Sequence, residues 1–193
     1  MGWHNGRVTG DGPAEWITQH QSVRLRPVEE RDLDILERIL VEPALSGPFE
    51  WRGFNDPTSH RRRWQQDRYL GQRDSMLAVA LPEEDRSFAG FVGWRAAGLP
   101  GPVVSYSIGI LLLPQHRGHG LGSTAQCLLA DYLFSTTVAN RIEAGTETEN
   151  IAEQRALEKA GFQREGLHRG LGFRAGRMVD GLTYARLRSD PHP

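Results

Sequence analysis

Residues 117–122, Arg-Gly-His-Gly-Leu-Gly, have the composition and spacing of a site that binds an anion through its backbone. They follow an apolar, strand-like run and open a helix-like run. A glycine-rich turn at such a junction leaves several backbone N–H groups unpaired and pointing one way, and the helix dipole adds positive potential. The sequence therefore predicts a pyrophosphate site, with the hydroxyl of Ser123 nearby.

Two well-known glycine motifs do not fit this turn. A Walker loop needs Gly-Lys-Ser/Thr, and Lys159 is the only lysine of the chain. A Rossmann turn needs G-x-G-x-x-G early in a βαβ unit. Here the third glycine comes one residue too soon for that motif, and the whole turn lies late in the chain. His116 and His119 have no third ligand at useful spacing, so we expect turn histidines and no metal.

The pattern Arg-x-x-Gly-x-Gly resembles the Q/R-x-x-G-x-G/A signature of the GNAT superfamily of acyl-CoA-dependent N-acyltransferases. Residues 106–114 are similar to the strand that precedes that turn. Asn150, residues 157–162 (LEKAGF) and residues 165–169 (EGLHR) resemble the RimJ/RimL-like branch, the ribosomal-protein N-terminal acetyltransferase relatives. The resemblance covers about residues 22–190.

This resemblance implies acetyl-CoA as co-substrate and a cleft where the central strand splays from its neighbour. Strand backbone would pair with the pantetheine amides, and the glycine turn would hold the pyrophosphate. Asn150 would contact the pantetheine arm, cap the next helix, or both. The implied cofactor-binding residues are Leu111, Leu112, Leu113, Arg117, Gly118, His119, Gly120, Leu121, Gly122, Ser123 and Asn150.

The positions at which the family places acids and bases differ here. A glutamate base would correspond to Ser107 on the central strand or to Gly145. The tyrosine that protonates the leaving thiolate corresponds to Leu157, and a serine of the RimL-like branch corresponds to Glu153. We keep Ser107 and Glu153 as candidate catalytic residues. Glu153 qualifies as a proton donor if burial raises its pKa. The alternative is that Glu153 is an acid in the first turn of its helix, where its negative charge interacts favourably with the helix dipole.

A site without an obvious base favours an acceptor amine of low pKa. At pH 7 an amine with a pKa near ~10.4 is neutral in about 1 part in 2,500, whereas an α-amine near ~7.8 is neutral in roughly one molecule in seven. The alternative is a base from the variable loop after the first helix. Glu50, Asp56 and His60 are the candidates there.

The loop around residues 48–54 is the predicted acceptor site. Phe49, Glu50 and Trp51 combine aromatic faces with one carboxylate, which suits a cationic or partly apolar amine. The alternative is that Phe49 and Trp51 only cover the core.

These residues must be positioned by a single α/β domain over residues 22–190. We expect a mixed, mostly antiparallel sheet of about six to seven strands flanked by helices, with a splayed central strand pair, and a tail at residues 1–21. The periodicity predicts strands near 22–26, 76–81, 88–94, 103–113, 141–147, 163–167 and 178–186, and helices near 32–40, 56–70, 120–134 and 150–159. Strand 103–113 should be central and buried on both faces in its second half.

Composition limits the functional class. A net charge of −1 argues against nucleic-acid binding. No apolar run of ~20 residues is present, so we expect no membrane partner. The single cysteine and the lack of a secretory signal favour the cytoplasm, and the chain is expected to be a monomer or a homodimer.

We expect an N-acetyltransferase that moves an acetyl group from acetyl-CoA to a primary amine by direct attack in a ternary complex. The acceptor would be a protein N-terminal α-amine or a small amine such as an antibiotic. A non-catalytic acyl-CoA-binding sensor is the alternative from another class, because the usual catalytic positions are altered.

Overall fold

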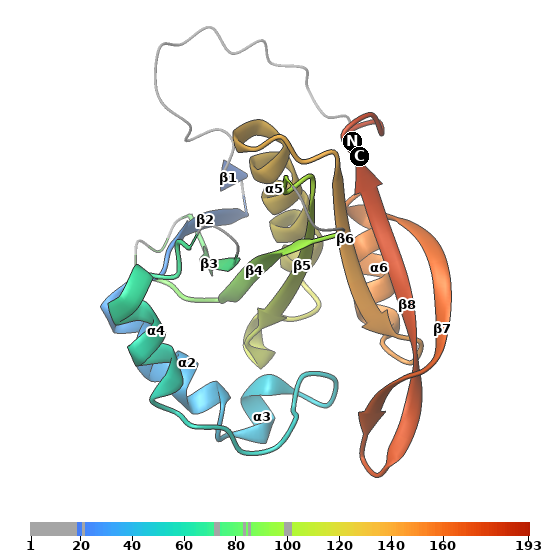
Figure 1. Ribbon diagram of the computed structural model, residues 1–193. Coiled ribbons are helices and arrows are strands. Elements are labelled where there is room, and N and C mark those ends of the chain that lie inside the picture. Colours follow the sequence, from blue (N-terminus) through green and yellow to red (C-terminus); the bar gives the residue numbers. More distant parts are fainter. Residues whose placement is uncertain (1–18, 21, 72–73, 83, 85, 99–101) are drawn as a thin grey trace, which may run out of the picture.

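A computed structural model describes residues 19–20, 22–71, 74–82, 84, 86–98 and 102–193. One sheet runs through the molecule in the order β1-β2-β3-β4-β5-β6-β8-β7 (Figure 1). Its strands are β1 (Gln19–His20), β2 (Val23–Pro27), β3 (Asp74–Ala80), β4 (Gly90–Ala97), β5 (Ser105–Leu112), β6 (Arg141–Glu147), β7 (Gln163–Arg174) and β8 (Arg177–Leu187). The sheet has one strand more than the upper expectation of seven, namely the two-residue β1, which lies within the expected tail. Residues 1–18 and 21 of that tail lie outside the described residues.

The described strands pair antiparallel except at one place. β5 and β6 run parallel and pair from Ser105 with Arg141 to Ile108 with Ala144. Both strands continue beyond that point, but their pairing does not. β5 remains paired with β4 along its whole length, while β6 remains paired with β8. The expected splayed central pair is therefore confirmed, and it lies between β5 and β6.

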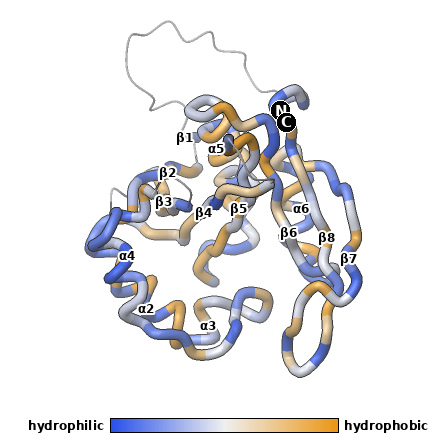
Figure 2. Tube along the Cα trace, viewed as in Figure 1, coloured by the Kyte–Doolittle hydropathy of each residue, from blue (hydrophilic) through white to orange (hydrophobic). Residues whose placement is uncertain are grey.

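Helices cover both faces of the sheet. Their bounds are α2 (Leu33–Ile39), α3 (Pro43–Ser46), α4 (Ser59–Asp67), α5 (Leu121–Thr136) and α6 (Ile151–Lys159), with 3-10 turns η1 (Glu30–Asp32) and η2 (Pro114–His116). Side chains of a strand alternate between faces, so Leu77 and Val79 pack in the core under α5 and α6, whereas Ala78 packs with α2. In Figure 2, α4 is mostly hydrophilic, which agrees with its position at the edge of the core that Ala78 forms with α2.

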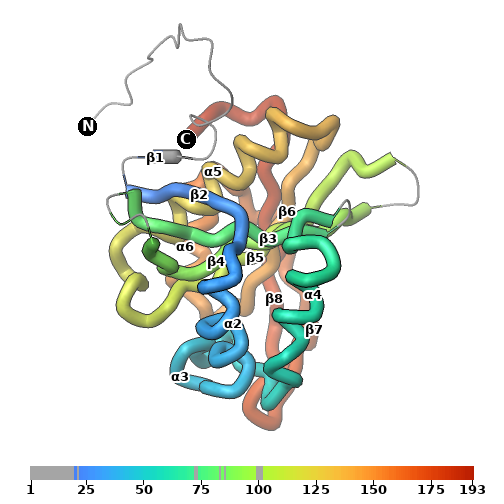
Figure 3. Tube along the Cα trace, turned by 90° about the vertical axis from the view of Figure 1, so that its left-hand side faces the viewer, coloured from blue at the N-terminus to red at the C-terminus, as the bar shows by residue number. Residues whose placement is uncertain are grey.

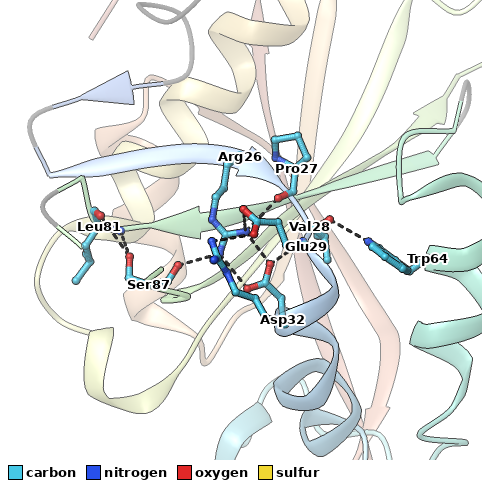
Figure 4. A network of polar contacts seen from close by, with 9 residues as sticks. Arg26, Pro27, Val28, Glu29, Asp32, Trp64, Leu81 and Ser87 are labelled. Carbon is cyan, nitrogen blue, oxygen red and sulfur yellow. Dashed lines mark hydrogen bonds and ion pairs between the residues drawn. The ribbon is translucent and has the colours of Figure 1, made fainter. Parts of the chain in front are cut away.

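A buried ion pair fixes the entry to α2 (Figure 4). Arg26 of β2 donates to both carboxylate oxygens of Asp32, at 2.7 and 2.9 Å, and to the carbonyl of Ser87 at 2.9 Å. Asp32 also accepts from the backbone N–H of Glu29 at 2.8 Å. Because both charged groups are almost fully buried, removing one partner would leave an uncompensated charge. The network holds β2, η1 and the β3–β4 connection together.

The structure departs from the sequence-based expectations in four places. The variable loop expected after the first helix begins with the short helix α3, and the helix expected over 56–70 is confined to Ser59–Asp67. β7 and β8 are longer than expected and form a hairpin that projects at the same end of the molecule as α3 (Figures 1 and 3). β5 is central, but its second half is not buried on both faces: Gly109 is exposed because it borders the gap to β6. In the part of the chain described, no helix is both long enough and apolar enough to cross a membrane.

Candidate active site

A cleft of 840 Å³ opens where β5 and β6 separate. One wall is the second half of β5 and the turn that leads into α5. The opposite wall is the end of β6 and the exposed side of α6. The loop after α3 and the β7–β8 hairpin border its remaining sides. The lining residues that carry polar or charged side chains are Ser46, Glu50, Arg52, Arg117, Ser123, Thr146, Glu147, Asn150, Glu153, Arg155, Lys159 and Asp180.

The glycine turn has the backbone conformation that the sequence predicts. Gly118 and Gly120 have φ of +81° and +79°, which glycine adopts without steric cost, and Gly120 caps the N-terminus of α5. Thr124 donates its backbone N–H to Gly120 at 3.3 Å. Within the described residues, no acceptor pairs with the N–H groups of residues 118–123. Several donors at the N-terminus of a 16-residue helix thus remain available to an anion.

The free edge of β5 presents backbone groups to the cleft. Leu113 donates its N–H to the carbonyl of Ala89, the residue immediately before β4, at 2.9 Å. Because N–H directions alternate along a strand, Leu111 also faces β4, and Ile110 and Leu112 face the gap. The donors for a ligand in this cleft are therefore on Ile110 and Leu112, whereas the N–H of Leu113 is already used.

The side chain of Arg117 does not extend into the anion site. Its Nε donates to the carbonyl of Leu112 at 2.7 Å, and Nη2 donates to the carbonyls of Leu45 and Ser46 at 2.7 and 3.2 Å. Burial lowers the pKa of the guanidinium, and the charge of Glu50 opposes that shift. The guanidinium of Arg117, one of the implied cofactor-binding residues, is thus bound to backbone carbonyls.

Helix α6 begins at the cleft and carries a carboxyl group there. The side chain of Asn150 accepts from the backbone N–H of Glu153 at 3.3 Å, so Asn150 is an N-cap and also lines the cleft. Burial raises the pKa of Glu153 to about 7, with a further contribution from the charge of Glu50. A hydrogen bond from the fully buried Gln126 of α5 lowers it in part. The condition set for Glu153 as a proton donor is met.

Glu50 contributes a second carboxyl group, from the loop after α3. Its side chain lines the cleft, and burial by the surrounding residues raises its pKa. The charge of Arg52 opposes this shift, and the charge of Glu147 adds to it. Glu147 itself is paired with Arg174 at 2.7 Å and with Arg52 at 3.8 Å. Of these acids, Glu50 is the one whose charge raises the pKa of Glu153.

The other two predicted acceptor residues have different surroundings. Phe49 lines the cleft, and Arg174 of β7 lies over its ring, 4.9 Å from the centroid. Trp51 does not line the cleft; it packs edge-on against Phe54, with ring centroids 5.4 Å apart. The loop thus presents Phe49 and Glu50 to the cleft and turns Trp51 away.

Other candidates also lie outside the cleft. Ser107 is partly buried on β5, in register with Arg95 of β4 and Glu143 of β6, and does not line the cavity. His60 hydrogen-bonds the hydroxyl of Tyr69, and Asp56 pairs with Arg62 at 2.7 Å. The structure therefore brings Glu50 and Glu153 together and leaves the remaining acid–base candidates apart.

Two residues of the glycine turn point away from the cleft. The side chain of Leu121 is buried in the core under α5. His119 is exposed and lines a second cavity, of 620 Å³, together with His116 and Glu84. Only their backbone N–H groups belong to the predicted anion site.

The sequence reading missed two basic side chains of α6. Arg155 and Lys159 are four residues apart, so they lie on one face of the helix, and both line the cleft. Their spacing in a helix that Asn150 opens was the available signal. Leu171 and Val179 of the hairpin also line the cleft, and no pattern in the sequence indicates this because β7 was expected to end earlier.

A cluster of Cys127, Asp131 and His192 on the far side of α5 has ligand atoms within 4.8 Å of one another. Arg186 donates to Asp131 at 2.9 Å and to the Cys127 sulfur at 3.7 Å. A guanidinium already supplies the positive charge that a metal ion would bring, so the cluster is an ion-pair network.

The geometry of the cleft agrees with comparisons to known proteins. The pattern of the acetyltransferase (GNAT) domain matches residues 22–163. The chain belongs to the GNAT acetyltransferase family. It is 27% identical over 174 residues to the uncharacterized N-acetyltransferase p20 of Bacillus licheniformis, covering 88% of this chain and 95% of that protein.

Solved structures show the same fold. RimJ of Mycobacterium smegmatis, in complex with CoA-disulfide, gives a TM-score of 0.72 at 26% identity, covering 86% of this chain and 82% of RimJ. Spermidine N-acetyltransferase from Vibrio cholerae, in complex with CoA and spermine, gives a TM-score of 0.70 at 20% identity, covering 89% and 98%. This GNAT domain thus shares its architecture with two proteins solved with a form of CoA, one of which is a spermidine N-acetyltransferase.

Proposed function

We propose that this protein transfers an acetyl group from acetyl-CoA to a primary amine. The observation that carries the proposal is the cleft between β5 and β6, closed at one end by the unpaired N–H groups of residues 118–123. The pyrophosphate suits those donors. Arg155 and Lys159 add positive charge on the opposite wall.

The free edge of β5 would bind and polarise the acetyl donor. Backbone N–H groups of Ile110 and Leu112 face the gap, and they suit the pantetheine amides and the thioester carbonyl oxygen. Fixed donors aimed at a developing oxyanion typically contribute about 3 kcal/mol to a barrier. Asn150 lines the opposite wall at the start of α6 and suits a contact with the pantetheine arm.

The two carboxyl groups divide the proton transfers. The amine nitrogen attacks the thioester carbon, the C–S bond breaks, and the acylated nitrogen loses a proton to the carboxylate of Glu50. Glu153, with its pKa of about 7, is partly protonated at neutral pH and gives a proton to the departing sulfur. Acid and base are thus distinguished by environment. Ser107 takes no part in this scheme because it does not line the cleft.

The acceptor binds on the side of the cleft bordered by the loop at Phe49 and Glu50 and by the β7–β8 hairpin. Both a protein N-terminus and a small amine fit this description, since RimJ and the spermidine enzyme share the fold. Release of free thiol from acetyl-CoA, measured with a panel of α-amines, polyamines and aminoglycosides, tests the proposal. CoA binding without thiol release for any amine would instead favour the acyl-CoA-binding sensor.

A further inference from the structure

The side chain of Arg117 links the loop that carries Glu50 to the β5 side of the cleft. Its guanidinium lies between the last residue of β5 and the C-terminus of α3, with three hydrogen bonds of 2.7 to 3.2 Å. All three acceptors are backbone carbonyls. These hydrogen bonds therefore depend on where the backbone lies and not on which side chains it carries. The backbone of Arg117 leads directly into the glycine turn.

The α3 side of this junction is shaped around the guanidinium. Gly47 has φ +83°, and a Cβ there would lie 2.7 Å from Nη1 of Arg117. The hydroxyl of the buried Ser46 donates to the carbonyl of Ile39 at 2.6 Å, which fixes α3 to the end of α2. Trp51 donates its N–H to the carbonyl of Gly47 at 3.1 Å. These contacts connect Arg117 to residues 45–51.

We infer that Arg117 is a positioning residue that couples occupancy of the CoA site to the placement of the acceptor loop. The inference rests on the proposed CoA site. An anion held by residues 118–123 fixes the start of α5 and the adjoining Arg117, and its planar fork then holds the carbonyls of Leu45 and Ser46. The loop bearing Glu50 becomes ordered against the cleft. Acetyl-CoA thus prepares the site for the amine before the amine arrives.

Hydrogen exchange tests this coupling with CoA alone, without knowledge of the acceptor. In the wild type, saturating CoA should slow amide exchange in residues 45–52 as well as in residues 118–123. Arg117→Lys keeps the charge but cannot reproduce the planar fork. This variant should still bind CoA by calorimetry and protect residues 118–123, while the protection of residues 45–52 is lost. Arg38→Gln is the matched control, because among the described residues Arg38 pairs locally, with Glu42 at 2.7 Å, outside the cleft.

A second variant approaches the junction from the other side. Gly47→Ala leaves Arg117 intact but places a methyl group against the guanidinium, and it should lose the same protection. Once an acceptor is known, the factor by which CoA raises the affinity for that acceptor can be measured. In either variant this factor should be smaller than in the wild type by on the order of tenfold. Protection of residues 45–52 that persists in both folded variants would overturn the inference. Wild-type protein that binds CoA without protecting residues 45–52 would overturn the inference alone, and failure to bind CoA would overturn the proposed function with it.

Discussion

The charge of Glu50 reaches Glu153 across the cleft and adds to the burial that raises the pKa of Glu153 to about 7. The two carboxyl groups come from opposite halves of the chain, one from the loop after α3 and one from the first turn of α6. Only the folding of the sheet brings them to one cavity. Gln126 limits the shift by donating to Glu153 from the buried side of α5.

Glu153→Gln tests the role of this carboxyl group as a proton donor. With saturating acceptor, kcat of the wild type should fall as pH rises through about 7, because the proton-donating form is lost. The glutamine variant should lack this limb and show a decrease in kcat of less than about a hundredfold at pH 6.5, at the low end of the effect of one proton carrier. Ser107→Ala should retain the limb. A limb that persists in the Glu153 variant would assign the pH dependence to another group.

The same substitution should change how stability depends on pH. A carboxyl whose folded pKa lies above its unfolded value binds protons more strongly in the folded state. Its contribution to stability is full below about pH 4 and is lost as pH rises to about 7. Glu153→Gln should therefore raise the free energy of unfolding by on the order of 1 to 3 kcal/mol at pH 8 and have little effect at pH 4. Urea unfolding at the two pH values measures this difference, and equal effects at both would contradict the raised pKa.

The sequence predicted the framework of this site better than its details. The glycine turn and the N-cap at Asn150 follow from local patterns, whereas the splayed strands follow from the family resemblance, and the structure has all three. The roles of Arg117 and Trp51 depend on which segments fold against them, and spacing alone carries no such information. Gly109 illustrates the same limit: an apolar run predicts burial, but the exposure of Gly109 follows from where β6 departs from β5.

Gly120→Asp should abolish the stabilisation that CoA gives. A carboxylate at the N-cap of α5 would repel the pyrophosphate and occupy its space. At about 100 times Kd, CoA should stabilise the wild type by about 2.7 kcal/mol, or roughly 5 to 11 °C in Tm. Gly176→Asp is the matched control, because both glycines have φ of +79° and Gly176 lies at the β7–β8 turn. A Gly120 variant with a normal CoA-induced shift would rule out the turn as the anion site.

The basic face of α6 should contribute to the affinity for acetyl-CoA. Replacing both Arg155 and Lys159 by glutamine removes two charges from the cleft wall. KM for acetyl-CoA should rise severalfold at low salt and less at high salt, since exposed charges are worth about 1 kcal/mol or less and are screened. KM for the acceptor should change little. Arg164→Gln, an exposed site on β7 outside the cleft, is the control; an equal effect there would indicate a general charge effect.

The acceptor loop offers a comparison between neighbouring residues that face different ways. Glu50 and Phe49 line the cleft, whereas Trp51 is turned toward Phe54. Glu50→Gln should raise KM for the acceptor, lower kcat within the 10² to 10⁴ range of a proton carrier, and flatten the acid side of the pH profile. KM for acetyl-CoA should stay nearly constant in that variant.

Trp51→Ala should act differently, because it removes packing within the loop and no group from the cleft. We expect a smaller rise in acceptor KM, little change in the pH profile, and a loss of stability of about 1 kcal/mol for a partly buried aromatic contact. Steady-state kinetics with both substrates varied, together with thermal unfolding, separates the two variants. A larger effect on acceptor KM from Trp51 than from Glu50 would move the acceptor to the outer side of the loop and leave Glu50 without its proposed role.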